Sequence, residues 1–248
     1  MTPAAAAATG MAVLASHHPT GVTESRDGVA LAAAGVSGRP FNTGWVTAAP
    51  IDAETTAEWA HERLAGTGRP FAIYVPAPLR ESVAAPFARL GLPLGDTLPG
   101  MARAATEDVP PPPDGLTIRR AHDADSMAEH ATAMARGFGA PDPSGAVAVL
   151  VPGLASDGRA AMVTGYAGGE AVASAFCLLG GGVGNLFGIA VREEVRGRGY
   201  GTAVTWAAVA AAARMGAATV ALQATPMGEP VYLRMGFETE VVYDRYDG

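Results

Sequence analysis

Short apolar runs alternate along this chain with longer segments whose apolar residues recur at helical spacing, and glycine-rich turns separate them. The runs predict buried strands and the longer segments predict helices, which together indicate an α/β (α+β) fold. The elements expected in the first half are a helix over 4–17, strands over 22–26, 29–34 and 44–48, a helix over 52–65, a strand over 71–75, a helix over 81–90 and a strand over 100–104. Those expected in the second half are strands over 116–120, 161–167, 171–179, 186–191, 218–225 and 237–245, helices over 123–137 and 202–215, a helix-like piece near 147–151, and a short helix before the last strand.

Turn residues and prolines divide this pattern further. Asp27-Gly28 and Gly168-Gly169 each separate two strand-like runs, as two-residue hairpin turns do. Pro110 to Pro113 form an uninterrupted proline run, which is stiff and extended and lies outside any core. The sequence therefore predicts a domain over 1–106, a linker over 107–115 and a domain over 116–248.

A weak internal repeat relates the two predicted domains. The strand-like run beginning at Phe71, followed by Phe87-Ala-Arg-Leu-Gly-Leu92, parallels the run beginning at Thr219, followed by Tyr232-Leu-Arg-Met-Gly-Phe237. The repeat favours two similar domains in tandem, and the alternative is two unrelated α/β pieces that share a helix ending in glycine.

Composition excludes several classes of function. The 248 residues carry a net charge of −7, and the two halves are similarly acidic, which argues against nucleic acid as a partner. The single cysteine, Cys177, excludes an internal disulfide and a cysteine-based metal site. The uncharged stretch 171–191 is interrupted by Gly180 to Gly182, so we expect two buried strands rather than a membrane span. The alanine-rich start has no basic residue before it and predicts a helix rather than a signal peptide, so we expect a cytoplasmic protein without a membrane partner.

The chemistry is concentrated between the strand that ends at Val191 and the helix that follows Thr202. Residues 196–201, here called the glycine turn, join them with glycines at alternate positions. A glycine-rich turn and a helix N-terminus both present backbone N–H groups, and together they suit a phosphate or pyrophosphate. A P-loop needs a lysine and the chain has none, while a Rossmann fingerprint fails because Thr202 stands where its last glycine should be. What remains is the pattern Arg-x-x-Gly-x-Gly, met by Arg196, Gly199 and Gly201.

This pattern resembles the acyl-CoA signature of the GNAT superfamily of N-acyltransferases. A second signature follows, because Tyr232 stands four residues before Gly236-Phe237 and after a strand and a short helix. The resemblance covers about 115–248. It implies a mixed sheet, splayed open in its middle and flanked by helices, with the fold duplicated and the N-terminal copy degenerate.

The resemblance also implies a reaction and its site. The protein would be an N-acetyltransferase that moves the acetyl group of acetyl-CoA to a primary amine, with Tyr232 protonating the leaving sulfur. The family's phosphate and pantetheine contacts fall on Ile189, Ala190, Val191, Arg196, Gly197, Arg198, Gly199, Tyr200, Gly201, Thr202 and Thr225. Thr225 stands where many relatives carry Asn, so that contact is altered. The expected partners are acetyl-CoA and a small-molecule amine, without a metal, and the protein is a possible homodimer.

The general base stays open on sequence grounds. Some relatives carry Glu where this chain has Asn185, which cannot accept a proton. A chain of water molecules, Asp142, Tyr166 or Glu170 remain as alternatives. His122 and His130 are expected at the surface, because no carboxylate–histidine metal spacing accompanies them. Two other readings of function remain: a non-catalytic acyl-CoA-binding module, and transfer to a non-amine acceptor.

Overall fold

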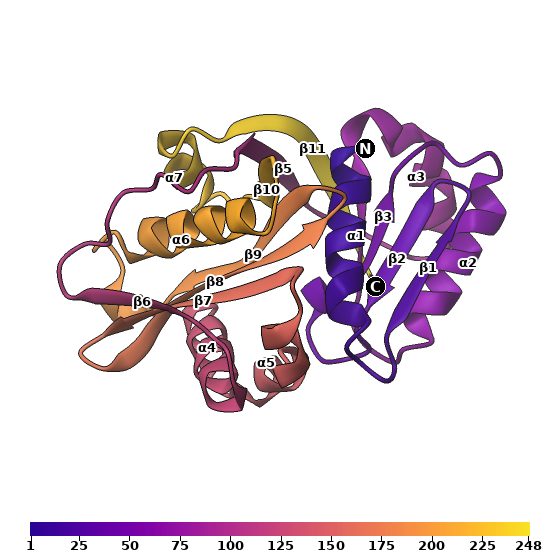
Figure 1. Ribbon diagram of the computed structural model, residues 1–248. Helices are drawn as coiled ribbons and strands as arrows, with labels where there is room; N and C mark the ends of the chain where they lie inside the picture. Colours follow the sequence, from indigo (N-terminus) through magenta and orange to yellow (C-terminus); the bar gives the residue numbers. More distant parts are fainter.

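The computed structural model describes residues 1–248 as one mixed sheet with helices on both faces (Figure 1). The strands are β1 Val22–Arg26, β2 Val29–Ala33, β3 Asn42–Val46, β4 Ala72–Pro76, β5 Leu94–Ala104, β6 Leu116–Arg120, β7 Ala160–Ala167, β8 Glu170–Gly180, β9 Val183–Val191, β10 Thr219–Gln223 and β11 Glu238–Asp247. The helices are α1 Pro3–Ala15, α2 Ala53–Ala65, α3 Arg80–Arg89, α4 Ala124–Gly137, α5 Ser144–Val149, α6 Tyr200–Arg214 and α7 Glu229–Arg234. The strands lie in the order β1-β2-β3-β4-β11-β5-β10-β9-β8-β7-β6.

The predicted elements and the mixed sheet are confirmed, with one strand much longer than expected. β5 begins at Leu94, although its first residues are exposed and include a glycine and an aspartate, which strands usually avoid. They are extended because they pair antiparallel with β11, a partner distant in sequence. The expected helix over 202–215 begins slightly earlier, at Tyr200.

The two halves of the chain exchange one strand each. β5 comes from the N-terminal half, residues 1–106, yet it lies between β10 and β11 of the C-terminal half, residues 116–248. β11 in turn lies between β4 and β5, and all these pairings are antiparallel. Each exchanged strand also contributes a side chain to the hydrophobic core of the other half. Met101 of β5 packs in the C-terminal core, and Tyr246 of β11 packs in the N-terminal core. Tyr246 there meets Phe87 with ring centroids 5.0 Å apart.

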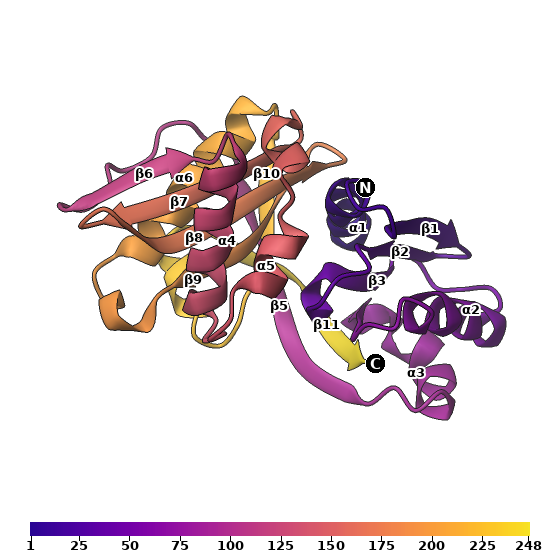
Figure 2. The same ribbon diagram turned by 90° about the horizontal axis from the view of Figure 1, so that it is seen from below.

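Helices cover the two halves of the sheet differently (Figures 1 and 2). In the C-terminal half α6 lies on one face and α4 with α5 on the other, and in the N-terminal half α2 and α3 share a face. α1 contacts both β2 and β8, so it packs against both halves. The buried Asn185 side chain donates to the Ala6 carbonyl oxygen of α1 at 3.1 Å, which gives this residue a structural role away from the predicted chemistry.

The repeat seen in the sequence corresponds to matching units of structure. β4–α3 and β10–α7 are each followed by a glycine with positive φ, Gly91 at 70° and Gly236 at 79°. In both, the amide three residues after the helix donates to the carbonyl oxygen of the aromatic residue, Leu92 to Phe87 and Phe237 to Tyr232, at 3.0 Å. Because strands are exchanged, the sheet runs on without a break between the halves, and the domain boundaries drawn from the proline run stay a prediction.

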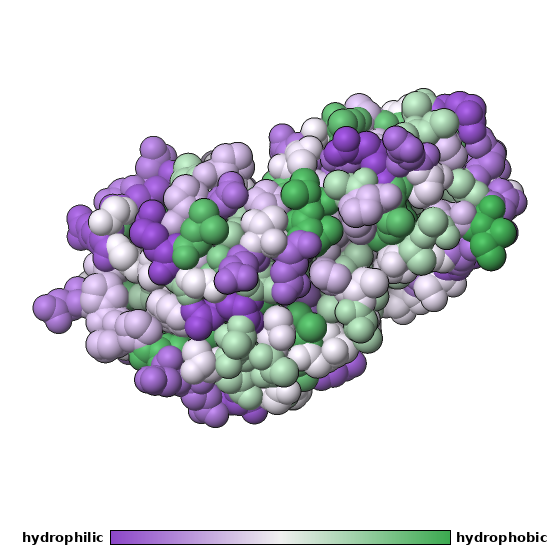
Figure 3. Space-filling view, turned by 90° about the horizontal axis from the view of Figure 1, so that it is seen from above, coloured by the Kyte–Doolittle hydropathy of each residue, from purple (hydrophilic) through white to green (hydrophobic).

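No helix is long and apolar enough to cross a membrane. The face drawn in Figure 3 is largely hydrophilic, with apolar residues in small separate groups over a larger and a smaller lobe.

Candidate functional site

The sheet opens between β9 and β10. These parallel strands pair at only three positions, the last being Ala221 with Asn185. β9 then continues to Val191, held on its other side by β8. The edge of β9 that faces β10 is therefore unpaired over Leu186 to Val191, which is the gap that the splayed sheet was expected to have.

A bulge at Gly188 bends β9 where the gap begins. The register with β8 shifts between Ser174 and Phe176, and Gly188 has φ +59°. A Cβ on Gly188 would lie 2.5 Å from the Phe176 ring, so only glycine fits here. The Ser174 hydroxyl donates to the Gly188 carbonyl oxygen at 2.8 Å and fixes the bulge.

The glycine turn leads from β9 into α6 and leaves its amides free. Gly197 and Gly199 both have φ +77°, a conformation that side chains with a Cβ rarely adopt. None of the N–H groups from Gly197 to Thr202 donates to a protein acceptor, and the first bond of the helix runs from Ala203 to the Gly199 carbonyl oxygen. No side chain caps α6. The helix N-terminus therefore presents a row of free donors and a partial positive charge.

Arg196 holds this region together through main-chain carbonyls. Its Nε donates to Val191 at 3.1 Å and its Nη2 donates to Gly137, the last residue of α4, at 2.9 Å. The end of α4 thereby lies against β9, and a Cβ on Gly137 would stand 2.7 Å from the Ala190 side chain. Arg192 is occupied as well, in ion pairs with Glu170 and Glu194.

Tyr232 lies across the gap from β9, on α7. Its ring is 8% exposed and packs against Phe237, with centroids 5.8 Å apart. Burial raises the pKa of the Tyr232 phenol to about 12, so the hydroxyl stays protonated at neutral pH. A buried hydroxyl that keeps its proton can donate it to a stronger base that forms nearby.

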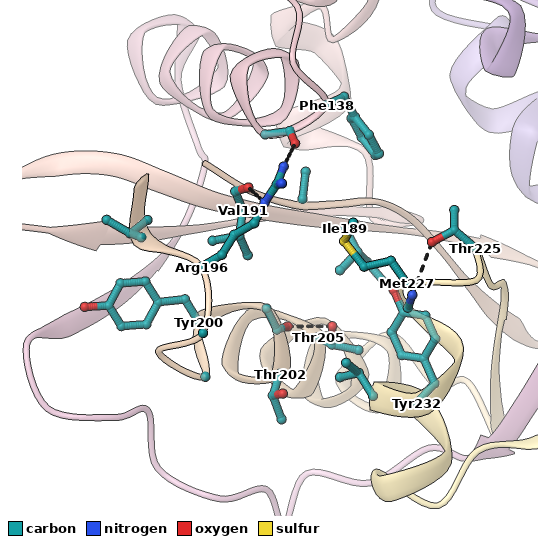
Figure 4. A pocket seen from close by; sticks show the side chains of 18 of the residues that line it. Phe138, Ile189, Val191, Arg196, Tyr200, Thr202, Thr205, Thr225, Met227 and Tyr232 are labelled. Atoms are coloured by element: carbon teal, nitrogen blue, oxygen red, sulfur yellow. Dashed lines mark hydrogen bonds between the residues drawn. The ribbon is translucent and has the colours of Figure 1, made fainter. Parts of the chain in front are cut away.

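These features line one pocket of about 830 Å³ (Figure 4). All the residues predicted to contact the donor line it except Arg198, and so does Tyr232. The prediction missed two parts of the lining. One is the end of α4, which has no sequence signature beyond the glycines that flank Phe138, and the other is most of the segment from Pro226 to Arg234. Thr225 faces the pocket, and its Oγ accepts from the Gly228 amide at 3.2 Å, which leaves the hydroxyl proton free for a ligand.

None of the candidate bases lines the pocket. Asp142 is bound to Ser144, Glu170 pairs with Arg192, and the Tyr166 hydroxyl donates to Glu129 at 2.6 Å. Burial, together with that bond, raises the pKa of the Tyr166 phenol to about 12. No carboxylate or imidazole is among the lining residues, so a route through water is the alternative that this geometry favours.

The expectation that His130 lies at the surface was wrong. His130 is fully buried, because it follows Met127 by one turn of α4 and faces the sheet with it. Its Nδ1 lies 3.0 Å from the Thr164 hydroxyl, and burial lowers its pKa to about 4, so the ring is neutral. His122 is exposed, as expected.

Comparisons with known proteins agree with this geometry. Residues 110–228 match the model of the acetyltransferase (GNAT) domain. A GCN5-related N-acetyltransferase from Kribbella flavida superposes with a TM-score of 0.69 at 18% identity, over 98% of this chain and 95% of that one. A GCN5-related N-acetyltransferase from Sphaerobacter thermophilus gives 0.61 at 16% identity, over 90% and 80% of the two chains.

A tandem GNAT protein from the clavulanic acid biosynthesis pathway gives a TM-score of 0.58 at 15% identity, over 96% of this chain and 87% of that one. At these identities the solved structures establish the fold alone. The comparison with curated proteins found no match. The sequence signatures, the splayed sheet and the matching domain model together identify residues 110–228 as a GNAT acetyltransferase domain, within a chain whose fold matches GNAT structures over nearly its whole length.

Proposed function

We propose that this protein transfers the acetyl group of acetyl-CoA to a primary amine of a small molecule, with Tyr232 as general acid. The observation that carries the proposal is the path along the pocket. It begins at the free amides of the glycine turn, follows the unpaired edge of β9, and ends beside the Tyr232 phenol.

The free amides suit the diphosphate of acetyl-CoA. Backbone N–H groups at a helix N-terminus bind phosphate oxygens, and Gly197 and Gly199 give the turn the conformation that directs them. The open edge of β9 from Ile189 to Val191 offers main-chain donors and acceptors to the amides of the pantetheine arm, as an added strand would. Thr225, across the gap, has a hydroxyl proton to donate.

Acetyl-CoA, when bound, supplies an acetyl thioester, whose carbonyl carbon forms a bond to the amine nitrogen while its bond to sulfur breaks. Tyr232 gives its phenolic proton to the departing sulfur. The nitrogen loses one proton, which passes to water because no base lines the pocket, and water returns a proton to Tyr232. The products are the N-acetyl amine and free coenzyme A.

The test is Tyr232→Phe, which removes only the hydroxyl. We expect kcat to fall roughly 10²- to 10⁴-fold, the usual contribution of a general acid, while the KM for acetyl-CoA changes little. Tyr243→Phe is the matched control, because Tyr243 is another buried tyrosine with a raised pKa but lies outside the pocket. Free thiol release measures both, and equal turnover by the Tyr232 variant would remove this residue from the mechanism.

A non-catalytic acyl-CoA-binding module is the second candidate, favoured by the lack of a carboxylate or imidazole in the pocket. Thermal protection by coenzyme A, without thiol release from acetyl-CoA with any amine, would support it.

A further inference from the structure

The pocket has two chemically different ends, and this inference rests on the proposed function. Arg196, Tyr200 and Thr202 lie at one end, while Phe138, Ile189, Met227 and Tyr232 lie at the other (Figure 4). We call the second group the apolar end. Since the proposed path brings the thioester to Tyr232, the acceptor must reach the apolar end.

Two large apolar side chains stand open to solvent there. Phe138 is 63% exposed and Met227 is 75% exposed, although both line the pocket. They come from different segments, Phe138 from the end of α4 and Met227 from the loop between β10 and α7. Exposed apolar residues gathered at a pocket mark a surface that a ligand covers.

The backbone that carries Phe138 is held in place. Its amide bonds to the Met134 carbonyl oxygen at 3.0 Å, and the preceding residue, Gly137, packs against Ala190 and accepts from Arg196. Met227, by contrast, has a flexible and polarisable side chain that can adapt to what it covers. A ring carried on a fixed backbone and an adaptable thioether suit a hydrocarbon group placed between them.

The charges of the pocket disfavour a positively charged acceptor. The only charged side chains that line it are Arg196 and Arg234, although the whole chain has a net charge of −7. An ammonium group covered by Phe138 and Met227 would lose part of its water without gaining a carboxylate partner, which favours the uncharged amine. A polycationic acceptor would bring further charges into the same unfavourable surroundings.

We infer that the acceptor is an apolar amine, whose alkyl or aryl group packs between Phe138 and Met227, and that it binds as the uncharged free base. The acceptor's own ionisation then controls its reaction, because the enzyme contributes no base beside it.

The experiment compares three amines with acetyl-CoA as donor and free thiol release as the readout. Hexylamine and 1,6-diaminohexane differ by one terminal ammonium, and ethanolamine lacks the hydrocarbon chain. We expect kcat/KM for hexylamine to exceed that for either of the others at least tenfold, about what two buried methylene groups contribute. Below the amine's pKa, about 10 for an alkyl amine, kcat/KM should rise roughly tenfold per pH unit as the free base increases.

Two variants locate the effect. Phe138→Ala and Met227→Ala should each lower the ratio of kcat/KM for hexylamine to that for ethanolamine by about tenfold, since each removes one wall of the apolar end. Leu233→Ala is the matched control, because Leu233 is 53% exposed on α7 but does not line the pocket. It should leave that ratio unchanged.

Each alternative outcome has a distinct meaning. Equal use of hexylamine and 1,6-diaminohexane would overturn the inference and leave the proposed function standing. A second result would also overturn the inference and leave the proposed function standing. In it, Phe138→Ala changes the ratio of kcat/KM for hexanoyl-CoA to that for acetyl-CoA but leaves the ratio between the amines unchanged, because the apolar end would then hold the acyl chain. If no amine releases thiol although acetyl-CoA protects the protein from heat, the proposed function itself fails.

Discussion

The two halves share an order of strands and helices, but the backbone amides at the N-terminus of the corresponding helix are free in one half and hydrogen-bonded in the other. In the C-terminal half, α6 begins with free amides. In the N-terminal half, α2 begins with amides that the chain's own carboxylates already bind. Asp27 accepts from Ile51 at 3.0 Å and from Asp52 at 2.9 Å, and the Asp52 side chain accepts from Thr55 at 3.1 Å.

The strands before these helices differ as well. β3 pairs with β4 as far as Trp45 and ends at Val46, so no long unpaired edge follows. β9 leaves its pairing with β10 at Asn185 and runs on to Val191. The N-terminal half therefore has neither the free donors nor the open edge, while it retains the packing. We expect the N-terminal half to stabilise the fold without binding a ligand of its own.

The largest expected effect tests that last point. Removing residues 1–106 takes away β5, whose Met101 packs in the C-terminal core, and leaves β11 without its neighbours on either side. We expect residues 107–248 not to fold, because an unpaired central strand leaves backbone groups and apolar surface exposed. Circular dichroism with thermal unfolding measures this. A cooperative transition of the truncated chain would show that the halves are independent and that the strand exchange is dispensable.

The sequence predicted this exchange poorly, and the reason is physical. Helices and hairpins depend on neighbouring residues, so α2, with Asp52 as its cap, and the turn at Asp27-Gly28 could be predicted locally. The partners of β5 and β11 lie more than a hundred residues away, and the exposed start of β5 has no apolar alternation to reveal it. Its extended form is imposed by pairing alone.

The candidate site likewise has parts that the sequence predicted and parts that it did not. The glycine turn and Tyr232 belong to contiguous motifs, and the site residues predicted from those motifs, except Arg198, line one pocket. Phe138 carries no motif, and its importance depends on how the end of α4 meets Ala190. His130 was wrongly expected at the surface because the residues that bury it, Thr164 and Phe176, come from strands β7 and β8, which are distant in sequence. Local patterns predict the proposed donor site, whereas tertiary packing forms the end of the pocket where we propose that the acceptor binds.

The second prediction concerns the free amides of α6. Gly199→Val should weaken acetyl-CoA binding roughly 100-fold, because a Cβ at φ +77° strains the turn and redirects charge-assisted hydrogen bonds. Gly216→Val is the matched control, since Gly216 follows the same helix with φ +88° and open space around its Cβ position. Isothermal titration calorimetry with acetyl-CoA should give wild-type affinity for the control, with a comparable loss of thermal stability in both. Equal affinity in all three proteins would mean that the diphosphate binds elsewhere.

The smallest expected effect is that of Asp27→Asn in the N-terminal half. Hydrogen bonds from Ile51 and Asp52 lower the pKa of Asp27, so its charged form stabilises the folded state. Because the folded pKa is depressed, this stabilisation is complete above the unfolded value of about 3.9 and is lost as the pH falls through the folded pKa. We expect Asp27→Asn to have a modestly lower Tm at pH 7, with the difference from wild type shrinking in strong acid. Asn tolerates the positive φ of 41° at this position, so backbone strain does not explain the change.

The same variant tests whether the carboxylate alone keeps the N-terminal half closed to a ligand. Titration with acetyl-CoA should still give one site per chain, because β3 ends too early to offer an open edge even when the charge on Asp27 is gone. A second site appearing in Asp27→Asn would mean that one carboxylate had blocked it, and that the short β3 had no part in the loss of binding.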